Sequence, residues 1–232
     1  MLAEHAHARH HVGDQPAAIP DAATGVITVD LGQIARNWRA LAGLVAPAEC
    51  GAVVKANAYG LGAGRVIPAL AEAGCKSFFI ATPDEAFEAR ALAPNATIYA
   101  LDGLMPGAGE ALAAARAIPV LSSLAEVAEW RELASKTGRK LGTALHLDSG
   151  LNRLGLSASD VRKLAKDDEL LNALELRLVM SHLASADDPN DPKNEHQRAA
   201  FDAVRALLPS APASLSASVR PHWGRMPACT IT

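Results

Sequence analysis

Short apolar runs alternate with amphipathic stretches from residue 25 almost to the end of this chain. Strands are predicted at residues 25–30, 51–56, 77–81, 97–101, 118–123, 143–148, 175–183 and 213–218. Helices are predicted between them, at residues 31–45, 63–73, 83–92, 107–116, 123–137, 157–166 and 193–208. Continuously apolar strands that alternate with helices are typical of βαβ units, in which a parallel sheet is buried on both faces. The pattern predicts an α/β fold, a (β/α)8 TIM-type barrel that is incomplete because it has seven of the eight barrel strands. A doubly wound sheet of seven strands is the alternative.

Composition excludes several classes of partner. The 232 residues carry a net charge of −3, and 50% of them are hydrophobic while 4% are aromatic. Such a chain has ample material for a packed core, and the absence of a basic run argues against nucleic acid as a partner. No apolar stretch approaches the roughly 20 residues that a membrane span requires, so no membrane partner is predicted. Three cysteines without a CxxC pair predict neither a disulfide framework nor a cysteine-rich zinc site.

The first 24 residues are polar and rich in proline and alanine, and four of the eight histidines lie there. We predict a disordered leader at 1–24 without a specific metal site, because no fold would fix the ligands. The leader lacks the continuous apolar segment of a signal peptide, so a cytoplasmic protein is expected. The barrel domain is predicted at 25–218, and a separate tail is predicted at 219–232.

The first barrel strand ends in a lysine that is followed by glycines, in the sequence VVKANAYGLGAG at 53–64. A charged ammonium is costly to bury, and a lysine at a strand end tends to have the lowered pKa that Schiff-base chemistry requires. A lysine that extends from a strand end to water is the structural alternative for Lys55. The glycines also suggest a dinucleotide fingerprint, but the third glycine of GxGxxG, counted from Gly60, would fall at Arg65, so the spacing excludes it.

Polar residues also follow later strands, at the carboxyl ends where parallel sheets carry their active sites. The fifth barrel strand leads into HLDSGLNRLG at 146–155, where Arg153 could bind a carboxylate through two hydrogen bonds or form an ordinary loop pair with Asp148. The sixth leads to His182, either a catalyst or a structural histidine. The seventh ends at Ser218, whose hydroxyl could bind phosphate or cap a helix.

Three of these strand ends resemble motifs of the alanine racemases, which are pyridoxal-phosphate-dependent enzymes of fold type III. The family's lysine motif, K-A-N-A-Y-G-x-G, is similar to VVKANAYGLG in this chain. Its D-T-G-M-x-R-x-G motif is similar to LDSGLNRLG, and its H-F/L-A-x-A-D segment is similar to SHLASAD. Order and spacing also agree, and the resemblance covers residues 25–218. It implies the family's N-terminal barrel, pyridoxal 5′-phosphate as cofactor, alanine as substrate and a homodimer.

The resemblance also assigns roles to individual residues. Lys55 would bind the cofactor covalently and act as one of two catalytic bases, while Tyr59 and Ser218 would bind the cofactor phosphate. Arg153 would lie beside the phenolic oxygen of the cofactor and the substrate carboxylate. His182 would support the polar network under the pyridine ring. The pyridine ring would absorb the negative charge that forms when the substrate Cα loses its proton.

This sequence departs from the family pattern at several positions. His146 replaces a lysine that many members carry two residues before the motif aspartate, and Leu151 replaces a methionine. Likeness ends near Ser218, before the C-terminal β-domain that would supply the opposing tyrosine base across the dimer interface. We therefore expect racemisation of L-alanine to D-alanine, for peptidoglycan precursors, as the family activity, and a truncated chain with impaired activity. A non-catalytic cofactor-binding protein, comparable to pyridoxal-phosphate homeostasis proteins, and an inactive remnant are the alternatives.

Overall fold

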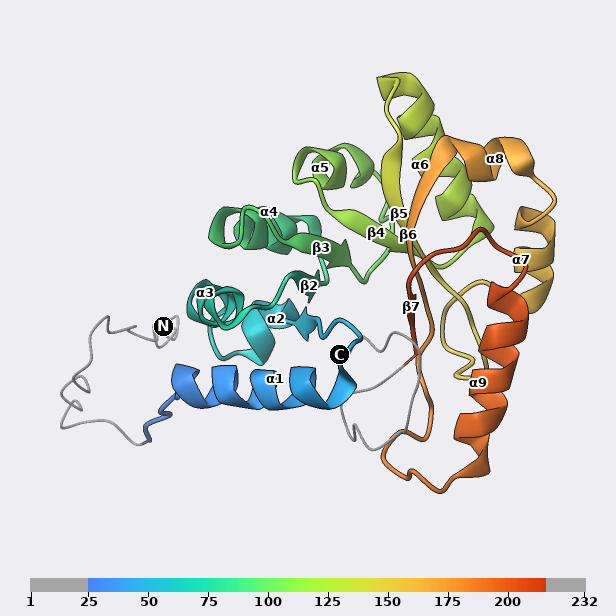
Figure 1. The fold of residues 1–232 in the computed structure, drawn as a ribbon. Coiled ribbons are helices and arrows are strands. Elements are labelled where there is room, and N and C mark those ends of the chain that lie inside the picture. The colour runs from blue at the N-terminus through green and yellow to red at the C-terminus, as the bar shows by residue number, and fades with distance from the viewer. Residues whose placement is uncertain (1–24, 216–232) are drawn as a thin grey trace, which may run out of the picture. The chain divides into compact units, whose positions relative to one another are not determined.

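The computed structural model describes residues 25–215 of the chain (Figure 1). Its internal contacts divide the chain into two units, Met1–Asp30 and Leu31–Thr232. The leader predicted at 1–24 and the tail predicted at 219–232 lie outside the described residues. None of the helices within the described part of the chain is long and apolar enough to cross a membrane.

The strand predicted at 25–30 is wrong. These six residues of the first unit form neither helix nor strand, and the apolar side chains of Val26 and Ile27 are exposed. An alternating apolar pattern predicts a strand only where a neighbouring strand accepts the backbone hydrogen bonds and a core buries one face. Both requirements depend on tertiary contacts, which the local sequence of this segment does not contain.

In the second unit, seven strands form one parallel sheet whose strand order follows the sequence. The strands are β1 (Ala52–Val53), β2 (Ser77–Ile80), β3 (Thr97–Ala100), β4 (Ile118–Leu121), β5 (Leu141–His146), β6 (Leu174–Met180) and β7 (Ala213–Ser214). A doubly wound sheet reverses its strand order at a switch point, so the sequential order excludes that alternative. The sheet curls, with β1 and β7 at its two ends, and confirms the predicted incomplete (β/α)8 barrel (Figure 1).

Helices follow the strands along the chain, as the sequence predicts. They are α1 (Leu31–Val45), α2 (Lys55–Tyr59), α3 (Ala63–Ala73), α4 (Pro83–Leu92), α5 (Gly109–Ala114), α6 (Leu124–Thr137), α7 (Ala158–Leu164), α8 (Asp168–Ala173) and α9 (Pro192–Arg205). The helices α4, α6 and α7 begin after Thr82, Ser123 and Ser157, whose hydroxyls accept hydrogen bonds from backbone amides of the first turn. The sequence did not predict α2 and α8.

Two apolar layers enclose the sheet. On the outer face, strand residues pack against the helices, where fully buried alanines such as Ala86 and Ala89 allow close contact. On the inner face, side chains of alternate strand positions form a second cluster that includes Phe79, Tyr99 and Met180. The rings of Phe79 and Tyr99 stack with centroids 4.8 Å apart. Burial on both faces explains why the strand sequences are continuously apolar rather than alternating.

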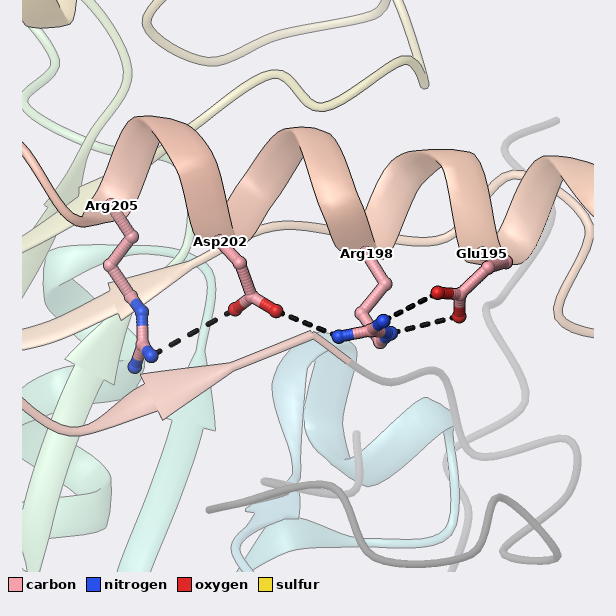
Figure 2. Close-up of polar contacts among 4 residues, drawn as sticks. All are labelled: Glu195, Arg198, Asp202 and Arg205. Carbon is pink, nitrogen blue, oxygen red and sulfur yellow. Dashed lines mark hydrogen bonds and ion pairs between the residues drawn. The ribbon is translucent and has the colours of Figure 1, made fainter.

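The last helix, α9, has one buried face and one charged face. Its buried face carries Phe201, and the charged face carries a row of four side chains (Figure 2). Arg198 donates to Glu195 and, at 2.9 Å, to Asp202, whose other oxygen lies 3.8 Å from Arg205. The hydrogen bond and charge of Glu195 raise the pKa of Arg198, and the reverse interaction lowers the pKa of Glu195. These pairs, three or four residues apart, stabilise the helix that holds the buried polar residues described below.

Candidate active site at the carboxyl edge of the sheet

The predicted site residues lie where parallel strands end at a common edge. Lys55 begins α2, two residues after β1, and Asp148 follows β5 in the same way. His182 likewise lies two residues after β6, and Arg153 lies in the loop after β5. Because all seven strands are parallel, these positions share the carboxyl edge of the sheet, which carries the active site in (β/α)8 barrels. Ser218 lies outside the described residues.

The backbone after Lys55 forms a left-handed turn. The four residues Ala56 to Tyr59 have φ values between 51° and 55°, and none of them is glycine. Each left-handed residue with a side chain costs roughly 1–2 kcal/mol relative to a right-handed one, so surrounding contacts must impose this conformation. The strand predicted at 51–56 is therefore wrong beyond Val53, because the chain turns away from the sheet before the lysine.

Asn57 joins this turn to the next helix. Its side-chain Oδ1 accepts a 2.7 Å hydrogen bond from the backbone amide of Ala63, the first residue of α3. Its own carbonyl accepts a hydrogen bond from the amide of Gly62, whose φ of 97° favours glycine. The left-handed residues 56–59, here called the lysine turn, are therefore joined to the start of α3 by hydrogen bonds. Gly62 allows this connection because it adopts a positive φ.

Glu85, in the first turn of α4, contacts the lysine turn from outside. Its Oε1 accepts a 2.7 Å hydrogen bond from the amide of Ala56, the residue after Lys55. Its Oε2 accepts a 2.7 Å hydrogen bond from the amide of Ala81, directly after β2. Sequence reasoning missed Glu85 as a site residue. The pattern Thr-x-x-Glu at 82–85 is a capping-box signal that predicts a helix start, but not the contact with Ala56.

Lys55 itself is half-buried, and Tyr59 is 64% exposed at the end of the turn. Among residues 25–215, no hydrogen bond or ion pair occupies the Lys55 ammonium group. Within the described residues, the amine is therefore not held by another side chain, which agrees with both interpretations of the sequence, a nucleophilic lysine and a lysine that extends to water.

The loop after β5 is organised by Asp148. Its Oδ1 accepts 3.0 Å hydrogen bonds from the amides of Gly150 and Asn152, and Asn152 has a left-handed φ of 56°. A Cβ on Gly155 would lie 2.8 Å from the amide nitrogen of Asp148, so glycine is required there. The structure contains no ion pair between Asp148 and Arg153, and the exposed Arg153 guanidinium makes no hydrogen bond to another described residue.

A buried glutamine connects α9 to the loop after β6. Gln197, which is 2% exposed, accepts a 2.8 Å hydrogen bond from the amide of Ala184 and donates to the carbonyl of His182 at 3.1 Å. The hydroxyls of Ser149 and Ser181 meet at 2.8 Å and join the loops after β5 and β6. Sequence reasoning missed Gln197, although its position four residues before Phe201 on the apolar face of a helix signals a buried polar contact.

His146 is the last residue of β5, and its side chain is 6% exposed. Burial, the largest cause, together with the nearby charges of His182 and Arg153 lowers its pKa from 6.5 to about 4, while Asp148 acts in the opposite direction. The imidazole is therefore neutral at physiological pH. The structure brings Arg153 and His182 near this neutral imidazole, but within the described residues no hydrogen bond or ion pair joins either of them to Lys55.

Comparison with known proteins places this geometry in a family. Residues 29–228 match the family model described as "Alanine racemase, N-terminal domain". The alanine racemase of Methylobacterium nodulans is 47% identical over 199 residues, which cover 86% of this chain and 54% of the relative. That of Brucella ovis is 44% identical over 198 residues, covering 85% and 50%. The chain therefore spans about half the length of the curated relatives that it matches.

Solved structures agree with the sequence comparison. The alanine racemase of Bartonella henselae, which holds covalently bound pyridoxal phosphate, matches with a TM-score of 0.83 and 37% identity, over 88% of this chain and 58% of that one. The biosynthetic alanine racemase of Pseudomonas aeruginosa matches with a TM-score of 0.77 and 29% identity, over 88% and 56%. Because the family model matches residues 29–228 and the fold matches over 88% of the chain, this chain belongs to the alanine racemase family and corresponds to its N-terminal domain.

Proposed function

We propose that this chain is the cofactor-binding barrel of a pyridoxal-phosphate-dependent racemase that interconverts L-alanine and D-alanine. The observation that carries the proposal is Lys55, a lysine at the carboxyl edge of the barrel whose ammonium group makes no hydrogen bond or ion pair with any other residue of 25–215. Its half-buried amine suits covalent attachment of an aldehyde cofactor. The exposed Arg153 guanidinium can bind an anionic group, and the neutral His146 on β5 provides a polar side chain near it. The residues present therefore fit pyridoxal phosphate.

In this proposal each residue has a separate task. Lys55 would hold the cofactor, and its Nζ would take or return the Cα proton on one face of the substrate. Arg153 binds the substrate carboxylate through two parallel hydrogen bonds, and Tyr59 and Ser218 hold the cofactor phosphate. His182, fixed through its carbonyl by Gln197, orients the polar groups beneath the cofactor ring. Bound pyridoxal phosphate supplies an electron sink for the charge left at Cα.

Racemisation also requires a base on the opposite face of Cα. Tyr99 does not fit this role in the described structure, because it is 8% exposed and stacks on Phe79 in the inner apolar cluster. Burial raises its pKa, which further disfavours proton transfer. We propose that the opposing base is a tyrosine of a partner subunit's β-domain, as the family resemblance implies. Loss of such a positioned base typically costs about 10²–10⁴ in rate.

A second candidate function, which the sequence leaves open, is binding of pyridoxal phosphate without racemisation of alanine, as in a cofactor-homeostasis protein. Two assays on the purified chain separate the possibilities. Cofactor binding is read from absorbance at about 420 nm and from borohydride fixation, followed by peptide mapping. Racemisation is read from a D-alanine-coupled assay.

Lys55→Ala and Lys140→Ala form a matched pair for the binding assay, because Lys140 is an exposed lysine before β5. The proposal requires that Lys55→Ala abolish the fixed adduct and that Lys140→Ala retain it. An adduct that persists on another lysine in Lys55→Ala would contradict the site. Binding without D-alanine formation would favour the second candidate function, and no binding at all would contradict both.

A further inference from the structure

The carboxylate of Glu85 joins the ends of two neighbouring strands. One oxygen accepts the amide of Ala56, after β1, and the other accepts the amide of Ala81, after β2, each at 2.7 Å. Hydrogen bonds from backbone amides to a charged carboxylate are stronger than those between neutral groups. Within the described chain, Glu85 is the side chain outside the lysine turn that accepts a hydrogen bond from the backbone of that turn.

We propose that Glu85 is a positioning residue for Lys55, an inference that rests on the proposed role of Lys55. The amide that Glu85 holds belongs to Ala56, the first of the four left-handed residues and the direct neighbour of the lysine. Without that acceptor, the turn loses an external contact that opposes its relaxation toward ordinary backbone conformations. The direction in which the lysine side chain leaves the sheet edge would then vary.

A second glutamate of the barrel makes the same pair of contacts, at strand ends that do not include the lysine turn. Glu126, in the first turn of α6, accepts the amide of Leu104 at 3.0 Å and the amide of Ser122 at 2.7 Å. These residues follow β3 and β4, so Glu126 joins that pair of strands as Glu85 joins β1 and β2. A Cβ on Gly103 would lie 2.3 Å from the Glu126 carboxylate, so glycine allows the close approach.

The two helix starts also share a sequence pattern. Residues 82–92 read TPDEAFEARAL and residues 123–133 read SLAEVAEWREL, which share the spacing [ST]-x-x-E-x-x-E-x-R-x-L. In both, the hydroxyl residue caps the helix and the glutamate three positions later reaches the strand ends. Glu126 is therefore a matched control, because its contacts have the same chemistry and similar lengths but do not involve the lysine turn.

The test compares Glu85→Gln, Glu126→Gln and Glu85→Asp in the full chain. The amide of glutamine keeps the size of the side chain but replaces one acceptor oxygen with a donor, so one backbone amide loses its partner. Hydrogen exchange of individual backbone amides, measured by NMR, shows whether each amide keeps its hydrogen bond to the glutamate. Exchange at Ala56 is expected to rise about 10- to 100-fold in Glu85→Gln and to stay unchanged in Glu126→Gln, where Leu104 should respond instead.

The reactivity of the Lys55 amine is measured in the same proteins, in two ways. The first is the rate of borohydride-trapped addition of pyridoxal phosphate to Lys55, and the second is the rate of acetylation of Lys55 by acetic anhydride, both read by peptide mapping. Glu85→Gln should change both rates about tenfold or more, and Glu126→Gln should change neither. Glu85→Asp keeps the charge but not the reach, so it should behave like Glu85→Gln if position, rather than charge, is what matters. Urea unfolding of each variant shows how much global stability has changed.

Three results would overturn the inference: unchanged Lys55 rates in Glu85→Gln, equal changes in Glu126→Gln, or wild-type behaviour of Glu85→Asp. Failure of the proposed function looks different. In that case, wild-type protein would not take up pyridoxal phosphate at Lys55, while acetylation and hydrogen exchange would still decide the role of Glu85.

Discussion

Acidification should destabilise this barrel through a single buried imidazole. His146 is 6% exposed on the inner side of β5, and its pKa falls from 6.5 to about 4 on folding. Between these two values, the unfolded chain binds a proton at His146 that the folded chain excludes. The free energy of unfolding therefore decreases as the pH falls through this window and recovers as the pH rises.

The magnitude follows from the two pKa values. The stability contributed by His146 is nearly complete near pH 7 and is about 2 kcal/mol lower at about pH 5. Asp160, Asp191 and Glu195 have lowered pKa values, so the stability they contribute is present above the pKa of the unfolded state and is lost mainly at lower pH. Urea unfolding at several pH values between about 5 and 7, at constant ionic strength, measures the histidine effect with little interference from these carboxylates.

His146→Gln isolates the contribution of this residue. The variant removes the titrating group, so its free energy of unfolding should depend less on pH by about 2 kcal/mol over the same window. His196→Gln is the matched control, because His196 is exposed on α9. It should keep the wild-type pH dependence. Equal pH dependence in wild type and His146→Gln would refute the argument and show that a proton is accommodated at His146 in the folded barrel.

Three further substitutions test individual contacts, two at the carboxyl edge of the sheet and one, at Arg90, beside the chain segments that precede β3 and β4. Gly155→Ala places a Cβ 2.8 Å from the amide nitrogen of Asp148 at a φ of 115°. The free energy of unfolding in urea is therefore expected to fall by at least about 2 kcal/mol, and a decrease below about 0.5 kcal/mol would contradict this prediction. Asn57→Ala removes the acceptor for the amide of Ala63, so hydrogen exchange at Ala63 should rise by about fivefold, and unchanged exchange would show that the cap is dispensable. Arg90→Lys leaves most of the four backbone carbonyls that Arg90 contacts without a donor, so the free energy of unfolding is expected to fall by about 1–3 kcal/mol. A melting temperature equal to that of wild type would show that these hydrogen bonds do not stabilise the fold.

Helix boundaries could be read from the sequence where local chemistry determines them. The predicted ranges 31–45, 63–73 and 83–92 coincide with α1, α3 and α4. For α4, Thr82 provides the cap and Pro83 fits the first helical turn, and for α3, Gly74 ends the helix in a left-handed conformation. These signals act within a few residues, so sequence reasoning can find them without knowing the fold.

The lysine turn could not be predicted in the same way. The letters KANAY favour an ordinary helix or the end of a strand, yet four of these five residues are left-handed. Their conformation depends on Glu85, whose contact with Ala56 spans 29 positions in the sequence. Lys55 itself was found because it belongs to a compact motif, whereas Glu85 and Gln197 act through contacts that exist only once the strands are side by side.

The strain in this turn makes the position of Lys55 depend on the neighbouring helices. Four left-handed residues together cost several kcal/mol, on the order of 1–2 kcal/mol each, which the turn alone does not recover. The compensating contacts come from Asn57, which caps α3, and from Glu85 in α4. A change at the start of either helix therefore alters the lysine without touching it. Conversely, once both helices are formed, the backbone beside the lysine is held in place before any ligand arrives, and a fixed starting point for the side chain favours preorganised chemistry at a barrel edge.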